Sequence, residues 1–414
     1  MSSDRTIVRE LAKHYAAIAA LPIQDEKRKL WTEHLSLKPT RTPILATCGM
    51  WNVWCRETFG DARMKCVDPF LKGIERTLRM QIFQHENVGD DSIQQPWYAV
   101  TAHHVEGGWG QMWGVSSSMR RPGGDGGAAA YDPPLKTWDD VAKLRMIHHA
   151  INEPETRRTV ERTHDVLGDI LPIDVVRSPG YHGFMADMST SVAYLRGLEQ
   201  LMVDMYESPK ELHQMLAFMR DSILANNQEA EDAGDYSLTS AANQSMPYAD
   251  GLKPLAPNSP CKRNDIWGFC AAQEYTLISP EFHEEFAFQY QKPIMEHYAM
   301  VHYGCCEDLG EKMNMLKKLT NLRSVAIAPL ANVRRCVEQL GKAAVASWRP
   351  NPTDMVCCGY DEALVERIVS QALADGKDGI MHIHLKDIET IQGDTTRLKR
   401  WVAKVRQIAA AVSI

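Results

Sequence analysis

A histidine, two adjacent cysteines and a carboxylate stand within one short block, His302-Tyr303-Gly304-Cys305-Cys306-Glu307. The apolar residues 300–303 predict a strand, and residues 309–319 predict a helix that begins just after the block. Imidazole, thiolate and carboxylate groups at the end of a strand are the ligands that a divalent metal such as zinc requires. Neighbouring side chains in a strand point to opposite sides, so a backbone turn at Gly304 is needed to bring a thiol inward.

The sequence predicts that one zinc ion binds at this block. The first-choice ligands are Cys305 and Cys306. The second-choice ligands are Glu307, His302 and His384. Two other interpretations stay open. The cysteines can be half-buried packing residues, since free cysteine is among the most buried residue types. His384 shares one side of its strand with His382 and can be an ordinary polar residue there.

Two further residues that follow apolar segments are candidates for catalysis. Glu274 is placed to act as a general acid or a metal ligand, and Lys386, beside Asp387, is placed to anchor a substrate. The alternatives are a solvated carboxylate at the start of a helix and a structural ion pair. An exposed ion pair of this kind contributes roughly 0–1 kcal/mol to stability.

Aromatic residues near the predicted strand ends are candidates for substrate binding. They are Trp51, Trp109, Trp113, Tyr303 and Trp348. Trp109 and Trp113 stand among four glycines in the segment 106–114, which predicts a mobile lid near the barrel mouth that stacks on a planar substrate. The alternative is a loop whose tryptophans pack against the barrel, and Trp51 is equally open to a packing role.

The elements that must position these residues alternate along the chain. Apolar segments at 300–303, 324–327, 343–347 and 379–385 are separated by helical patterns near 311–319, 333–340 and 361–374. Strand and helix in alternation predict a parallel sheet, and polar residues gathered just after the strands are typical of a (β/α)8 barrel. The sequence therefore predicts an α/β protein: a (β/α)8 TIM barrel over residues 41–414, preceded by a helical N-terminal arm at residues 1–40.

Composition narrows the class of protein. The chain has 414 residues, a formal net charge of -7 and a pI near 6.1, which argue against nucleic acid as the main partner. No apolar run is long enough to cross a bilayer. The N-terminus lacks an apolar signal core, so we expect a cytoplasmic protein. Its ten cysteines are then expected to be thiols or ligands rather than a disulfide framework.

Eight blocks spread over nearly the whole chain carry a family resemblance. They are Arg9-Glu10-Leu11-Ala12-Lys13, Asp68-Pro69-Phe70, Trp267-Gly268-Phe269, Gln273-Glu274, Ser279-Pro280-Glu281-Phe282, Tyr303-Gly304-Cys305-Cys306-Glu307, Trp348-Arg349-Pro350-Asn351-Pro352 and Leu385-Lys386-Asp387-Ile388. With these blocks the chain resembles the uroporphyrinogen decarboxylase-like superfamily of (β/α)8 barrels. Within the superfamily it is most similar to a branch found beside corrinoid-dependent methyltransferases. Its last predicted strand carries histidines where zinc members of the superfamily have a cysteine.

The resemblance implies an enzyme that moves a methyl group from a small methylated compound, such as an aryl methyl ether, to a cobalamin on a corrinoid-binding protein. Zinc assists the transfer in this interpretation, and a homodimer is compatible with it. One alternative is a thiol methyltransferase that takes the methyl group from the corrinoid protein. Others are a metal-independent decarboxylase of a carboxylated aromatic compound and a non-enzymatic corrinoid-binding or regulatory barrel.

Overall fold

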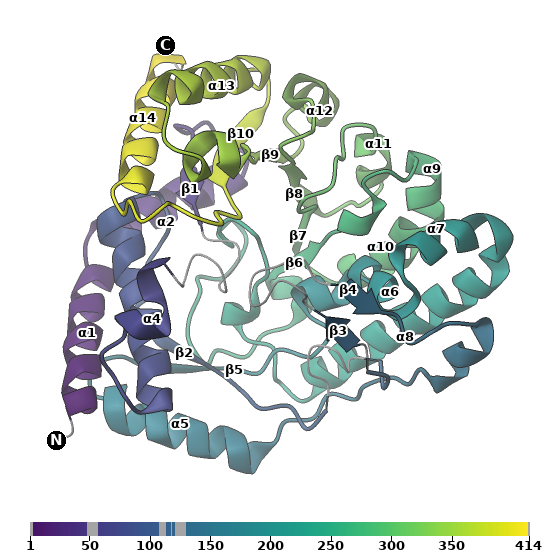
Figure 1. Ribbon diagram of the computed structural model, residues 1–414, viewed down its shortest axis with the longest axis horizontal. Coiled ribbons are helices and arrows are strands. Elements are labelled where there is room, and N and C mark those ends of the chain that lie inside the picture. The colour runs from purple at the N-terminus through teal and green to yellow at the C-terminus, as the bar shows by residue number, and fades with distance from the viewer. Residues whose placement is uncertain (1–2, 48–56, 107–112, 117, 121–129, 413–414) are drawn as a thin grey trace.

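Eight parallel strands surround the centre of the molecule, and helices lie outside them (Figure 1). The computed structural model describes residues 3–47, 57–106, 113–116, 118–120 and 130–412. The eight strands are β1 (Ile44–Ala46), β2 (Tyr98–Thr101), β5 (Ile173–Val176), β6 (Trp267–Cys270), β7 (Met300–Tyr303), β8 (Leu322–Ile327), β9 (Val345–Trp348) and β10 (Ile380–Leu385). They confirm the predicted α/β class and the TIM-barrel arrangement.

Six of the strands form one continuous parallel sheet, in the order β1-β10-β9-β8-β7-β6, and β2 pairs with β5 in a parallel two-stranded sheet. The longer helices are α1 (Ser3–Ala19), α2 (Ile23–Leu35), α4 (Pro69–Phe83), α5 (Glu153–Leu167), α6 (Ser189–Arg196), α7 (Leu198–Glu207), α8 (Pro209–Asp232), α10 (Gln289–Met295), α12 (Val333–Leu340), α13 (Glu362–Asp375) and α14 (Arg397–Val412). Asp68 begins α4 by accepting a hydrogen bond from the Leu71 amide, and Pro69 occupies the first helical position.

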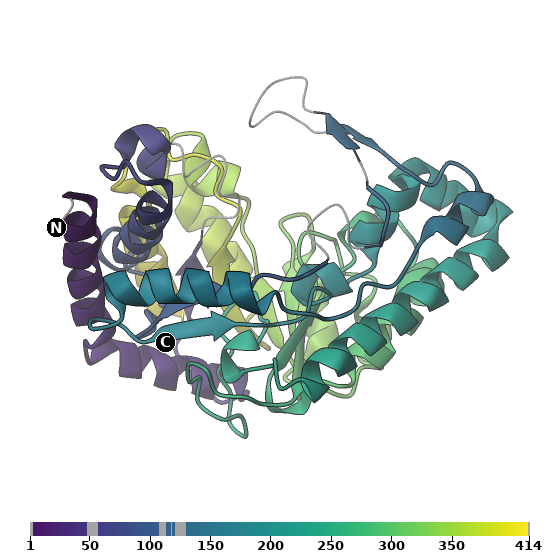
Figure 2. The ribbon, with the colours of Figure 1, turned by 90° about the horizontal axis from the view of Figure 1, so that it is seen from below.

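Short elements complete the chain. They are the one-turn helices α9 (Pro280–His283) and α11 (Met313–Leu316), the 3-10 turns η1 (Asp61–Arg63), η3 (Trp138–Lys143), η4 (Gly183–Ala186), η5 (Leu238–Ser240), η6 (Arg263–Asp265) and η7 (Gln273–Tyr275), and the π turns η2 (Gln84–Val88), η8 (Glu284–Phe288) and η9 (Thr353–Cys357). An antiparallel hairpin of β3 (Ser118–Arg120) and β4 (Ala130–Asp132) follows β2 and stands away from the body of the barrel (Figure 2).

The two N-terminal helices pack on different parts of the barrel. Helix α1 buries Val8 and Tyr15 against α4, in a core cluster that also contains Leu78. Helix α2 instead buries Trp31 in a second cluster with Trp267 of β6, near the amino-terminal ends of the strands. Helix α2 therefore covers part of that end of the barrel, opposite the carboxyl-terminal ends of the strands. The predicted domain boundary at residue 40 stays a prediction.

In the described residues, no backbone hydrogen-bond ladder joins β1 to β2 or β5 to β6. Side chains and loops fill these two places. Between β1 and β2, the carboxylates of Asp90 and Asp91 accept hydrogen bonds from the amides of Ala46 and Ile44, both at 2.9 Å. Beside β6, the amide of Ala242 donates to the carbonyl of Trp267 at 2.9 Å. These contacts satisfy strand groups that would otherwise be buried without partners.

Within the described part of the chain, none of the helices combines the length and the apolar composition needed to cross a membrane.

Candidate active site

The two adjacent cysteines lie at the carboxyl-terminal end of β7, where the backbone turns at Gly304. Gly304 has a φ of +99°, and a Cβ there would lie 2.6 Å from Leu309 Cδ1, so only glycine fits this turn. Beyond it the side chain of Cys305 is buried, Cys306 is exposed, and their sulfur atoms lie 3.5 Å apart. The turn thus brings one thiol inward and leaves its neighbour in contact with solvent.

The lysine that follows β10 faces the buried thiol. Lys386 Nζ lies 3.4 Å from Cys305 Sγ and 2.9 Å from Asp387 Oδ2, and that carboxylate oxygen is 3.8 Å from Cys306 Sγ. The hydrogen bond from Cys306 and the charges of Arg349 and Lys386 lower the pKa of Cys305 below its ordinary value. The same bond raises the pKa of Cys306. Cys305 is therefore the more acidic thiol of the pair, and Cys306 acts as the hydrogen-bond donor.

Arg349 follows β9 and joins the buried thiol to His302. The Nη1 group of Arg349 donates to the carbonyl oxygen of Cys305, and Nη2 lies 3.2 Å from His302 Nε2. His302 Nδ1 lies 3.0 Å from the hydroxyl of Ser324 on β8. Burial, and then the charge of Arg349, holds the pKa of His302 well below its usual range, so the ring is neutral and both of its nitrogen atoms are occupied.

His384 lies on the inner face of β10 beside the same group. Its Nε2 is 2.7 Å from the hydroxyl of Thr47, which follows β1. Burial and the charges of Arg349 and Lys386 hold the pKa of His384 well below its usual range. Its buried Nδ1 has no hydrogen-bond partner among the residues that the structure describes. One polar atom of a neutral imidazole is thus available to a ligand in the barrel interior.

Glu307 has a structural role in the geometry of the thiols. Its carboxylate is buried and accepts hydrogen bonds from the amides of Ala272, at 2.7 Å, and Cys305, at 2.8 Å. These bonds tie the segment after β6 to the segment after β7. The carboxylate oxygens therefore point at backbone amides that fix the position of Cys305.

The predicted zinc ligands do not form a complete metal shell in the described residues, where no group of three or more His, Cys, Asp or Glu side chains is arranged to hold a metal ion. Glu307 accepts from two amides, His302 contacts Ser324 and Arg349, and a lysine ammonium lies against Cys305. A complete shell requires about four donors. The described residues by themselves do not fit zinc, and zinc binding stays a prediction for metal analysis.

Glu274 belongs to a second acidic group at the end of β6. Its carboxylate accepts a hydrogen bond from the hydroxyl of Ser189 at 2.7 Å. Nearby Asp187 is fully buried, and burial, followed by the charge of Glu274, raises its pKa well above the usual value. A carboxyl group whose pKa is raised in this way can hold a proton for acid catalysis. Sequence reasoning missed Asp187.

The aromatic residues that the sequence predicts for substrate binding do not lie together in the structure. Trp51 and Trp109 lie outside the described residues, as does most of the segment 106–114, so the lid stays a prediction. Trp113 is 3% exposed, and its ring centroid lies 4.6 Å from that of Tyr181 in the main core. Tyr303 and Trp348 are buried in that core on the outer faces of their strands. The structure does not bring these last three side chains to the thiol group.

Three polar residues near the thiols escaped the sequence prediction. Arg349 stands in the block 348–352, but only its alternation with the outward Trp348 indicates that it faces the interior. Asn243 and Gln244 follow Ala242, which packs beside Cys305, and the Gln244 side-chain amide is buried without a hydrogen-bond partner among the described residues. These two residues belong to a loop, so no hydrophobic periodicity in the sequence could have revealed them.

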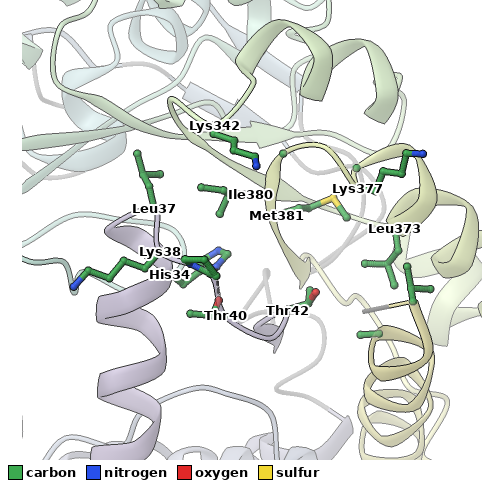
Figure 3. Close-up of a pocket in the computed structure, with 15 residues that line it drawn as sticks. His34, Leu37, Lys38, Thr40, Thr42, Lys342, Leu373, Lys377, Ile380 and Met381 are labelled. Carbon is green, nitrogen blue, oxygen red and sulfur yellow. Dashed lines mark hydrogen bonds between the residues drawn. The ribbon is translucent and has the colours of Figure 1, made fainter. Parts of the chain in front are cut away.

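A separate pocket opens at the opposite, amino-terminal end of the barrel (Figure 3). It has a volume of about 320 Å3 and is lined partly by His34, Thr42 and Lys342. His34 Nε2 lies 3.1 Å from His382 Nδ1, and His382 Nε2 lies 2.8 Å from the hydroxyl of Ser347. The pocket is thus connected to the barrel interior by buried histidines, but the thiols are at the other end of the strands.

Comparison with known proteins bears on the fold. No family model and no curated protein sequence matches the chain. Among solved structures, a methyltransferase from Methanosarcina mazei matches with a TM-score of 0.53 and 11% sequence identity, over 92% of this chain and 97% of that one. The two chains share a fold. At this identity the match establishes the barrel over nearly the whole chain, and the chemistry must be argued from the site.

Proposed function

We propose that this protein is a methyltransferase that takes a methyl group from a small methylated compound and delivers it to a corrinoid-binding protein. The observation that carries the proposal is the contact of 3.4 Å between Lys386 Nζ and Cys305 Sγ at the carboxyl-terminal ends of the barrel strands. Functional residues of barrel enzymes gather at that end. The fold shared with a methyltransferase and the resemblance of the sequence blocks support the same assignment.

The charges around Cys305 suit removal of a methyl group. A methyl group leaves as an electrophile, so the atom that loses it gains negative charge. Burial opposes the charge on Lys386, but Cys305 and Asp387 outweigh that effect and raise its pKa, so the ammonium persists at neutral pH. Lys386 and Arg349 are then positioned to stabilise a developing oxyanion in a site of low dielectric constant.

The partner must reach this group from outside the barrel. Cys306 is exposed, and Asp387 is half-buried beside it. On β2, Tyr98 and Val100 face the core. The residues that alternate with them are Ala99 and Thr101, and these are also exposed. Solvent therefore reaches both the thiol edge and one inner wall. The corrinoid of the partner protein supplies the methyl acceptor in this proposal, and the residues of this chain bind and orient the donor.

Methylation of cob(I)alamin tests the proposal. Purified protein is incubated with cob(I)alamin, free or on a corrinoid-binding protein, and a panel of methylated ethers, amines and thioethers. We expect formation of methylcobalamin with at least one donor and, in K386Q, a loss of about 100-fold in the rate. The variant K342Q, whose lysine lines the pocket at the opposite end of the barrel, is the matched control and should retain the rate.

Two results would contradict the proposal. Protein that forms no methylcobalamin with any donor class, on either form of the corrinoid, does not carry out this reaction. A K386Q variant with the full rate would show that the thiol–lysine group is not the site of the chemistry.

The reverse direction is a second candidate because the same cations would stabilise the thiolate of an acceptor. Arg349 and Lys386 lower the pKa of the Cys305 thiol, and a substrate thiol in the same place would experience the same field. Incubation with methylcobalamin and a panel of small thiols distinguishes the two directions, since only a thiol methyltransferase would yield thioethers.

A further inference from the structure

The guanidinium group of Arg349 is buried at the carboxyl-terminal end of the barrel without an ion pair to any described carboxylate. Arg349 is 3% exposed, and its two Nη groups contact the carbonyl oxygen of Cys305 and the neutral ring of His302. Its Nε–H group is also buried and has no hydrogen-bond partner in the part of the chain that the structure covers. A buried cation with an unused donor is costly unless an anion joins it.

Cys305 does not supply that anion directly. The direct contacts of its sulfur are with Lys386 and Cys306, at 3.4 and 3.5 Å. Arg349 instead touches the carbonyl oxygen of this residue. Lys386, in turn, is already paired with Asp387 at 2.9 Å. The positive charge of Arg349 is therefore left without a carboxylate or thiolate acceptor of its own among these residues.

Other unused polar atoms lie near the same guanidinium group. Trp348 pairs with Ile383 across β9 and β10, so the next residues, Arg349 and His384, project from neighbouring strands at the same level. His384 Nδ1 is buried without a partner among the described residues, and the same holds for Asn243 Nδ2 and the side-chain amide of Gln244 in the loop beside Cys305. Buried polar atoms normally have partners, so several unused ones around one cation indicate a ligand site.

We infer that Arg349 binds a carboxylate group of the substrate, so that the methylated compound is a small carboxylic acid. This inference rests on the proposed function, because it names the substrate of the same site. The chemistry fits a carboxylate, whose single charge matches the one guanidinium group and whose two oxygens can accept from the free donors, namely Arg349 Nε, Asn243 Nδ2 and Gln244 Nε2. A phosphate group carries more charge and would call for a second unpaired cation, whereas Lys386 is already paired with Asp387.

Binding of a matched pair of probes tests the inference without any methyl transfer. Titration calorimetry compares para-methoxybenzoate with para-methoxybenzamide, and methoxyacetate with methoxyacetamide, on the full chain. We expect each carboxylate to bind about tenfold to a hundredfold more tightly than its amide. In R349Q the preference should vanish, whereas R349K, which retains the charge, should keep part of it.

The chain offers a matched control in Arg323 of β8. Arg323 is half-buried and donates to the carbonyl oxygen of Leu35 at the opposite end of the barrel, so R323Q should keep the preference for carboxylates. Circular dichroism of R349Q and R349K shows whether each variant folds. If R349Q does not fold, the comparison of R349K with the wild-type protein remains.

Each outcome decides the inference separately from the proposed function. A carboxylate preference that depends on Arg349 supports the inference even if no probe donates its methyl group, a result that would count against methyl transfer alone. Equal binding of carboxylates and amides, a preference that survives in R349Q, or no saturable binding of any carboxylate would overturn it, even if other donors methylate cob(I)alamin.

Discussion

Cys305 and Lys386 come from strands that lie three places apart in the sheet, yet the lysine ammonium lies 3.4 Å from the thiol sulfur. The two residues are separated by 81 positions in the sequence. The contact exists because Gly304 turns the chain after β7 inward while Lys386 continues the inner face of β10 beyond His382 and His384. The thiol and the cation therefore interact electrostatically, and single substitutions can measure what each residue contributes.

The first prediction concerns the acidity of Cys305. The hydrogen bond from Cys306 is the largest factor that lowers its pKa, followed by the charges of Arg349 and Lys386. The thiolate should therefore form at a lower pH than that of an ordinary cysteine, about 8.5, and C306A should raise the midpoint. The midpoint is measured from the pH dependence of the ultraviolet absorbance of the thiolate, after the absorbance of the C305S variant has been subtracted. A midpoint unchanged by C306A would contradict the assigned cause.

The second prediction concerns the turn at Gly304. A Cβ at this position meets both a left-handed backbone, with φ of +99°, and the side chain of Leu309. We expect G304A to lower the free energy of unfolding by about 1–3 kcal/mol and to reduce methyl transfer, because Cys305 would be displaced. Urea denaturation and the cob(I)alamin assay measure the two effects.

Gly234 provides the control for that substitution. It is also left-handed, with φ of +74°, but no atom lies within 4 Å of the position that a Cβ would take there. G234A should therefore show backbone strain without loss of methyl transfer. If both variants lose activity equally, the close approach of Leu309 is not what positions the thiol.

The third prediction concerns the carboxylate that supports β1. Asp91 accepts hydrogen bonds from the Ile44 amide and from both Nη groups of Arg41, at 2.7 to 2.9 Å, and its side chain is 1% exposed. D91A leaves these donors unsatisfied, so we expect a loss of at least about 2 kcal/mol in the free energy of unfolding. D91N, which keeps one accepting oxygen, should lose less. Chemical denaturation ranks the variants, and equal losses would contradict the role of the accepting oxygens.

The fourth prediction concerns acid pH. Burial lowers the pKa of His34 to about 3, whereas an unfolded histidine titrates near 6.5. Below about pH 6.5 the unfolded chain therefore binds a proton that the folded chain excludes. We expect stability to fall as the pH is lowered toward 3, by up to about 1.4 kcal/mol per pH unit for this residue.

Replacement of His34 isolates its share of that pH dependence. H34Q should show a shallower decrease of stability between pH 6.5 and pH 5 in urea denaturation, although its hydrogen bond to His382 is altered. A slope that is the same in H34Q and in the wild-type protein would show that His34 is not held neutral by folding.

The strands were predictable because each carries its own periodic signal. Residues 300–303 and 379–385 were predicted as strands, and the structure places β7 at Met300–Tyr303 and β10 at Ile380–Leu385. Alternation in β10 also indicated that His382 and His384 share one face, and both are buried on the inner side. A strand's period of two is a local property, so a single sequence reveals it.

The site was only partly predictable because it depends on contacts between distant segments. Cys305 and Lys386 were identified from their positions after strands, but nothing local indicated that they touch. Arg349 was missed because its function depends on which face of β9 it follows, and Gln244 because loops carry no period. Glu307 was assigned as a ligand from its residue type, whereas its carboxylate accepts from two backbone amides that only the fold brings to it.

The eight strands of the barrel are divided between two sheets, and the reacting groups are not shared equally between them. Cys305, Arg349 and Lys386 all belong to strands or strand ends of the six-stranded sheet, and so do His302 and His384. The β2–β5 ribbon, with its exposed inner residues Ala99 and Thr101, is joined to that sheet through side chains and loops. The reacting groups are therefore held at their mutual distances by one continuous set of backbone hydrogen bonds, to which the β2–β5 ribbon does not contribute.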